Sequence, residues 1–140
     1  MIILDTNALS ETLKPVPGET VVRWLASQER LNVFVTVITQ AEMLYGIEVL
    51  ASGKRKLRLL DLTEKLFGDE GFQGRILPFD HQAAREFAKI AASRKTSGRP
   101  ISQFDAMIAA IARANRATLA TRNTADFEHC GIRLVNPWAA

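Results

Sequence analysis

The chain has a single cysteine, Cys130, and no hydrophobic run of membrane-spanning length. One cysteine excludes an intramolecular disulfide and fits a reducing compartment. The longest apolar run covers residues 106–112, whereas a membrane span needs roughly 20 residues. The first residues carry no cationic leader, and Asp5 would interrupt the apolar core of a signal peptide. We therefore expect a cytoplasmic protein that does not contact membranes.

The sequence also lacks the residue patterns of several common sites. Its two histidines, His81 and His129, do not combine with the lone cysteine at the spacing of a zinc site. It has no glycine-rich loop of the kind that cradles phosphates, which disfavours nucleotide binding. Few aromatic residues lie among the basic ones, so stacking of single-stranded bases is not indicated.

The length of 140 residues, with 47% hydrophobic and 24% charged residues, is typical of one folded domain covering residues 1–140. The net charge is +3, but it is unevenly distributed, because residues 81–122 contain eight basic and only two acidic residues. A basic half of this kind can indicate a polyanionic partner. Charge alone does not separate that interpretation from an ordinary solvated helix face.

Short apolar segments alternate with longer segments of helical period. Strands are expected at residues 1–4, 32–36, 75–79, 118–121 and 132–135. Helices are expected at residues 19–28, 39–52 and 56–67, and two more begin at the capping residues Asp80 and Ser102 and run through Arg94 and Asn115. This alternation predicts an α/β domain with a mainly parallel sheet. Ligands of such sheets bind beyond the carboxyl ends of the strands.

Four acids fall near expected strand ends or helix starts: Asp5, Glu42, Asp105 and Asp126. Each has a purely structural alternative. Asp5 can cap a short helix over residues 7–13, Asp126 can be a turn residue, and residues 39–42 and 102–105 both have the spacing of a capping box. If the acids converge, their charges repel unless a proton or cation compensates them. Clustered carboxylate oxygens suit Mg²⁺ or Mn²⁺.

Four segments of the sequence distinguish a converging acidic site from separate caps and turns, because they resemble those of a known family. The segments are IILDTNALSE, TVITQAEMLYGI, ISQFDAMIAAIA and LATRNTADFEHCGIRLVNPW. In this order and spacing, over residues 2–138, they resemble the PIN-domain ribonucleases, specifically the VapC/FitB-like toxins of bacterial toxin–antitoxin pairs. The resemblance implies a single PIN domain, folded as a three-layer α/β/α sandwich with a mainly parallel central sheet.

The resemblance further implies a metal-dependent endoribonuclease that hydrolyses RNA phosphodiester bonds. Asp5, Glu42 and Asp105 match the family's acids and would bind one or two Mg²⁺ or Mn²⁺ ions. Many members carry an aspartate where this chain has Asn123, so Asp126 is a further catalytic candidate; either residue can fill the fourth position, and either Glu42 or Asp126 can orient the attacking water. The polar residues expected to hold carboxylates or waters are Thr6, Asn7, Thr39, Thr121 and Asn123.

The implied partners are an RNA substrate, a cognate antitoxin that covers the active-site groove, and a second copy of the chain in a homodimer. The candidates for contacts with RNA phosphates are Arg94, Lys95, Arg99, Arg113, Arg116 and Arg122. Residues 51–74 carry no family motif, and we expect substrate specificity to diverge there.

Two other functions fit part of the pattern. One is a binding module that uses the acidic pocket without turnover, and metal-dependent RNA cleavage would distinguish the enzyme from it. The other is a phosphatase of the haloacid dehalogenase type, in which an aspartate also follows the first strand. Those phosphatases have a second aspartate two residues later, and Asn7 occupies that position here.

Overall fold

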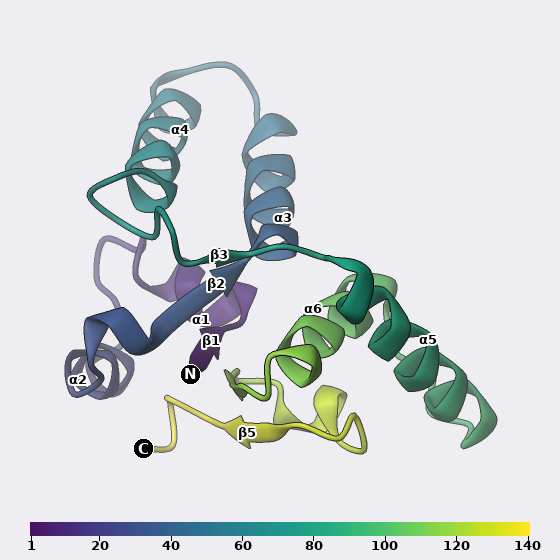
Figure 1. Ribbon diagram of the computed structural model, residues 1–140. Coiled ribbons are helices and arrows are strands. Elements are labelled where there is room, and N and C mark those ends of the chain that lie inside the picture. Colours follow the sequence, from purple (N-terminus) through teal and green to yellow (C-terminus); the bar gives the residue numbers. More distant parts are fainter.

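The computed structural model describes residues 1–140 and centres on a five-stranded sheet of order β3-β2-β1-β4-β5 (Figure 1). The strands are β1 (Ile2–Leu4), β2 (Val33–Thr36), β3 (Ile76–Leu77), β4 (Thr118–Ala120) and β5 (Arg133–Val135). Every neighbouring pair is parallel, and Ile3 of β1 lies opposite Phe34 on one side and Leu119 on the other. The predicted parallel sheet is therefore confirmed.

The helices are α1 (Thr6–Glu11), α2 (Glu19–Ala26), α3 (Val37–Glu48), α4 (Lys54–Phe67), α5 (His81–Thr96) and α6 (Gln103–Ala114). Two short 3₁₀ segments, η1 (Arg30–Asn32) and η2 (Thr124–Phe127), complete the chain. Each expected helix is present within a few residues of its predicted bounds. None of the helices combines the length and the apolar character that crossing a membrane requires.

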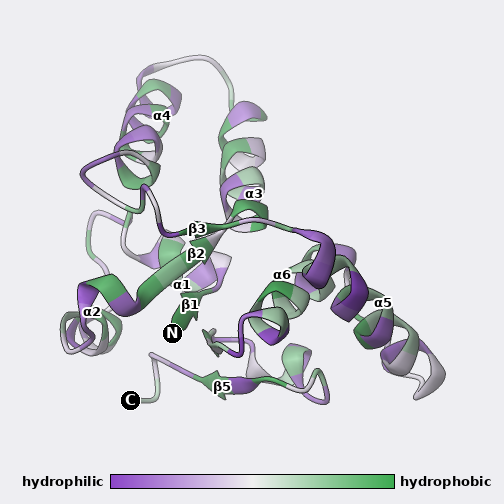
Figure 2. Ribbon diagram, viewed as in Figure 1, coloured by the Kyte–Doolittle hydropathy of each residue, from purple (hydrophilic) through white to green (hydrophobic).

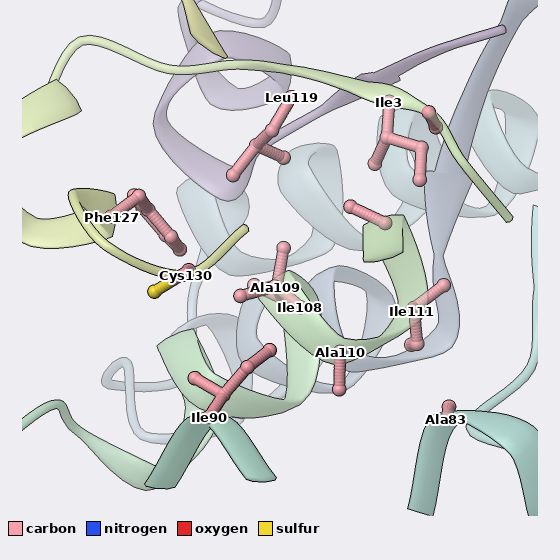
Figure 3. Close-up of a cluster of buried hydrophobic side chains, with 12 residues drawn as sticks. Ile3, Ala83, Ile90, Ile108, Ala109, Ala110, Ile111, Leu119, Phe127 and Cys130 are labelled. Atoms are coloured by element: carbon pink, nitrogen blue, oxygen red, sulfur yellow. The ribbon is translucent and has the colours of Figure 1, made fainter. Parts of the chain in front are cut away.

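Side chains of each strand alternate between two apolar layers, as expected for a sheet covered on both faces. Ile3 and Leu119 join one buried cluster, which includes residues of α5, α6 and η2 (Figure 3). Their neighbours Leu4 and Ala120 join a second buried cluster with residues of α1, α3 and α4. Helices therefore cover both faces of the sheet, which confirms the three-layer α/β/α sandwich.

The cap of α3 differs from the predicted one. We expected a helix from Thr39, with a capping box between Thr39 and Glu42, but α3 begins at Val37 and its cap is Thr36, whose Oγ1 accepts a hydrogen bond of 3.1 Å from the Thr39 amide. Thr39 is instead buried inside the first turn. The capping-box interpretation of Glu42 is therefore wrong, and its carboxylate is free for another role.

The other two predicted caps are confirmed. Asp80 accepts from the Ala83 amide at 2.9 Å, and Ser102 accepts from the Asp105 amide at 3.2 Å. The third sheet strand is shorter than expected, since only Ile76 and Leu77 pair with β2. Pro78 ends it because proline has no N–H group to donate to the ladder.

Helices α3 and α4 lie side by side and extend together beyond the edge of the sheet (Figure 1). Met43 and Ile47 of α3 are buried, but Leu44 and Tyr45 are exposed. A simple core face therefore explains only part of the apolar character of α3.

Candidate active site

The strand order reverses at β1, which has β2 on one side and β4 on the other. The carboxyl ends of β1 and β4 meet at this switch point, where open α/β sheets bind their ligands. Asp5 follows β1 directly, and Thr121 follows β4 directly. The Asp5 amide donates to the Ala120 carbonyl at 2.9 Å, so the sheet itself fixes the position of the aspartate.

Asp5 is held by side chains from both sides of the switch point. Its Oδ2 accepts a hydrogen bond of 2.8 Å from the Thr121 hydroxyl and one of 3.2 Å from Asn7 Nδ2. The Thr121 hydroxyl in turn accepts from the Asn123 amide at 3.1 Å. Asp5 has the position of the α1 cap, yet its side chain makes no capping hydrogen bond. The sequence alternative that treats Asp5 only as a helix cap therefore does not describe its contacts.

A chain of hydroxyl groups holds the second acid. Thr6 Oγ1 donates to Glu42 Oε1 at 2.8 Å, and the hydroxyls of Thr6 and Thr39 lie 3.0 Å apart. Since the single Thr6 proton points to Glu42, the Thr39 hydroxyl must donate to Thr6. Thr36 Oγ1 lies 3.4 Å from Thr39 Oγ1 and donates to it. Three threonines from β2, α3 and α1 thus orient one carboxylate.

Asp105 lies in the first turn of α6, and the cap of that helix sets its position. The Ser102 side chain accepts from the Asp105 amide, which fixes where α6 begins. Burial raises the pKa of the Asp105 carboxyl, and the negative charge of Asp126 raises it further, against the opposing hydrogen bond from Ser102. The acid therefore comes from a third element of the fold.

Replacing Ser102 with alanine should lower the free energy of unfolding by about 1 kcal/mol, because the first turn of α6 loses its side-chain acceptor. Urea denaturation measures the change. Ser102→Asp is the matched control, since aspartate is an equally good cap. Equal stability of Ser102→Ala and wild type would contradict this account of the helix start.

The acids influence one another electrostatically. Burial raises the pKa of Asp5 to about 6, with further increases from the charges of Asp105 and Glu42, although the hydrogen bond from Thr121 opposes the shift. The pKa of Glu42 is also raised, first by burial and then by the charge of Asp105. None of the ion pairs in the structure includes these residues. The site therefore concentrates negative charge without an ion-pair partner, and the charge of Arg94 only partly offsets the raised pKa of Asp105.

Buried and partly buried carboxylates without an ion-pair partner fit a hard divalent cation. No three His, Cys, Asp or Glu side chains are arranged so that they could hold a metal ion by themselves. Mg²⁺ does not require such a cage, because it is usually bound through one or two carboxylates and keeps several waters or binds substrate phosphates. The donor set here therefore fits Mg²⁺ or Mn²⁺ in an open site better than a closed structural metal centre.

The fourth acid stands apart from the first three. Asp126 lies on η2 and is exposed, and its charge influences Asp105. Asn123 is exposed beside it and contacts the site through its backbone amide. The structure thus brings Asp5, Glu42, Asp105 and their threonine and asparagine neighbours together, while Asp126 and Asn123 are exposed at the rim, Asp126 near Asp105 and Asn123 near Thr121.

One candidate for RNA contacts is corrected by the structure. Arg94 is only 7% exposed, and its guanidinium donates to the carbonyls of Arg99, Asp126 and Glu128 at 2.6–3.0 Å. These contacts make it a structural residue rather than a phosphate ligand. Arg113 pairs with Glu86 at 2.8 Å, and Arg122 lies over the Trp138 ring. The remaining candidates, Lys95, Arg99 and Arg116, are exposed.

Thr36, the first member of the hydroxyl chain, is not among the site residues predicted from the sequence. The feature that could have indicated it is its position as the last residue of β2, at the carboxyl end of the strand, where ligands of such sheets bind. A threonine in a β-branched strand is otherwise common enough to pass unnoticed.

The sequence matches the PIN domain family over residues 2–131. The toxin FitB of Neisseria gonorrhoeae is 42% identical over 138 residues, covering 99% of each chain. The VapC ribonuclease Y4jK of Sinorhizobium fredii is 39% identical over 140 residues, covering 99% of this chain and 98% of the relative. The crystal structure of FitAcB from N. gonorrhoeae aligns with a TM-score of 0.89 at 42% identity over all of both chains. The chain therefore belongs to the PIN-domain family, among the VapC and FitB toxins that its four segments resemble.

Proposed function

We propose that this protein is the ribonuclease toxin of a toxin–antitoxin pair and that it hydrolyses RNA with the help of Mg²⁺ or Mn²⁺. The observation that carries the proposal is the set of carboxylates at the switch point of the sheet. None of these carboxylates takes part in an ion pair. The relatives named as ribonucleases support RNA as the substrate.

Asp5 and Asp105 would hold the cation, with Glu42 as a further ligand or through a water. The cation would neutralise phosphate charge and lower the pKa of a bound water. Asn7 and Thr121 hold Asp5 at the end of β1. Thr6 holds Glu42, whose remaining oxygen can orient the attacking water or accept its proton.

The partners follow from the same proposal. FitB is named a toxin, and solved relatives include a VapBC complex from Salmonella typhimurium, 28% identical and bound to DNA. We propose that a cognate antitoxin binds this chain and covers its carboxylate site. Action on RNA would place the protein in the cytoplasm, and the homodimer implied by the resemblance stays a prediction.

Replacing Thr6 with valine should reduce RNA cleavage about 10- to 100-fold, the effect typical of losing a residue that orients a metal ligand. The substitution keeps the shape of the side chain but removes the donor to Glu42. Initial rates on a fluorescent RNA oligonucleotide measure the change. Thr6→Ser restores the hydroxyl and should restore most of the rate; equal rates for Thr6→Val and wild type would contradict the role of the hydroxyl chain.

The proposed chemistry is tested by the ends that cleavage leaves. Attack by water leaves no 2′,3′-cyclic phosphate, whereas metal-independent attack by the ribose 2′-hydroxyl forms one. We expect purified protein to cut a synthetic RNA with Mg²⁺ or Mn²⁺, to stop with EDTA, and to leave ends without a cyclic phosphate. Cyclic ends or cleavage in EDTA would overturn the mechanism. RNA binding without any cleavage would favour the binding module.

A further inference from the structure

A groove of about 490 Å³ adjoins the carboxylate site. Thr6 and Glu42 line it, so the groove and the site share a wall. The rest of its lining comes from α1, α3, α4 and the residues that follow α1, and includes the apolar side chains of Leu13, Met43, Ile47 and Leu59. A substrate bound at the carboxylates could therefore extend directly into it.

Thr63 of α4 lines this groove and has an unusual environment. The residue is only 1% exposed, and its hydroxyl has no hydrogen-bond partner. Buried polar groups in proteins are nearly always paired, and leaving one unpaired costs free energy. A threonine inside a helix commonly donates to the carbonyl four residues earlier, but this one does not. The wall of the groove therefore contains a hydroxyl whose hydrogen-bonding capacity is unused within the protein.

The mouth of the groove carries unpaired positive charge. Four of the first five residues of α4 are basic: Lys54, Arg55, Lys56 and Arg58 (Figure 2 shows the hydrophilic residues of this helix). This arrangement is unfavourable for the helix, because its amino-terminal end already carries a positive partial charge. Lys56 contacts Glu48, but Arg55 and Arg58 take part in none of the ion pairs. Both line the groove.

We propose that this groove binds an RNA nucleotide next to the bond that is cut, an inference that rests on the proposed function. Arg55 and Arg58 bind the flanking phosphate, since a guanidinium matches the geometry of phosphate oxygens. The apolar wall contacts the base, and the Thr63 hydroxyl pairs with a polar atom of the nucleotide. The groove lies against residues 51–74, the segment without a family motif, so it would also contribute to the choice of cleavage sequence.

The unpaired cations of the groove suit the phosphates of RNA. Arg55 and Arg58 are exposed and take part in no ion pair, so their guanidinium groups are free to bind phosphate oxygens. RNA supplies a phosphate at every nucleotide and a base whose flat face can pack on apolar side chains. The same groove thus matches both halves of a nucleotide.

The double variant Arg55→Gln/Arg58→Gln tests the phosphate contacts. We expect KM for a single-stranded RNA oligonucleotide to rise about tenfold with kcat within about twofold, because ground-state binding is lost. The slope of log Kd against log salt should fall by about 0.7, since each phosphate neutralised on a single strand contributes about 0.7. Kd is measured by fluorescence anisotropy with Asp5→Asn present, so that the RNA stays intact. Arg85→Gln/Lys89→Gln removes two cations from α5 and is the matched control.

The variant Thr63→Val tests the hydroxyl. Valine has nearly the same shape, so the melting temperature should be unchanged or higher, while sequencing of the cut ends should show a weaker preference for one nucleotide beside the cut. Unchanged KM, Kd and cut-site preference in these variants would overturn the inference and leave the groove to a protein occupant, with the proposed function intact. Absence of cleavage by wild type would overturn the proposed function, while the Kd comparison would still decide whether the groove binds RNA.

Discussion

Replacing Asp5 with asparagine should abolish RNA cleavage and make the metal-free protein more stable at neutral pH. The cleavage rate should fall at least about 1,000-fold, because asparagine cannot provide the charge that binds the cation and offsets developing charge on the phosphate. The gain in stability has a separate origin, namely burial of a charged carboxylate beside other carboxylates.

The sign of the stability change follows from the pKa of Asp5. In the folded protein this pKa is raised to about 6, whereas an unperturbed aspartate has a pKa of about 3.9. The folded state therefore binds the proton more tightly, and stability falls as pH rises between about 4 and 6. A shift of about two units corresponds to roughly 3 kcal/mol, and asparagine should recover about 1–2 kcal/mol of it.

Urea denaturation with EDTA at about pH 5 and 7 measures this effect. Asp5→Asn should have a higher free energy of unfolding than wild type at pH 7 and a smaller difference at pH 5. Adding Mn²⁺ should raise the melting temperature of wild type, since a ligand that binds only the folded state stabilises it. The variant should not respond. Asp69→Asn, at an exposed loop position, is the control and should match wild type in every measurement. A less stable Asp5→Asn protein that responds to Mn²⁺ would contradict the role assigned to Asp5.

Replacing Arg94 with methionine should lower the free energy of unfolding by about 3–5 kcal/mol. The guanidinium supplies donors to three backbone carbonyls, two of them on the segment that carries Asp126. Methionine fills a similar volume but leaves these acceptors without their partner, and each unpaired buried acceptor costs about 1–3 kcal/mol. For a domain of this size the loss is a large share of total stability.

The neighbouring Lys95→Met is the matched control, because Lys95 is exposed and its replacement should change stability by less than about 0.5 kcal/mol. The shift of the urea midpoint measures both variants. A stable Arg94→Met protein with a raised KM for RNA would support the original interpretation of Arg94 as a phosphate contact and contradict the structural role.

Arg94 illustrates what the sequence could not reveal. Its neighbours Lys95 and Arg99 make the segment resemble a solvated basic face, and its burial depends on carbonyls more than thirty residues later in the chain. The mistaken cap of α3 has a similar cause. Thr36 and Thr39 have the same spacing as Thr39 and Glu42, so by local pattern either threonine can be the cap of α3. The contact between Thr39 and Thr6 of α1 agrees only with a cap at Thr36.

The parts that could be predicted are those set by local chemistry. Strand and helix alternation predicted the parallel sheet, and Ser102 predicted the start of α6 and so the position of Asp105. The family resemblance predicted the convergence of Asp5, Glu42 and Asp105. The hydrophobic periodicity of the sequence did not indicate it. The charges at the start of α4 were visible in the sequence, but their relation to Thr63 and Glu42 required the groove between α3 and α4.

The central claim is that the carboxylates at the switch point bind a divalent cation used to cut RNA. The most direct measurement is the initial rate of RNA cleavage as a function of Mn²⁺ concentration for wild type, Asp105→Asn and the control Asp69→Asn. We predict that wild type and Asp69→Asn share one saturating curve that EDTA abolishes, and that Asp105→Asn is inactive or needs far more Mn²⁺. Equal curves for Asp105→Asn and wild type, or cleavage that persists in EDTA, would contradict the claim.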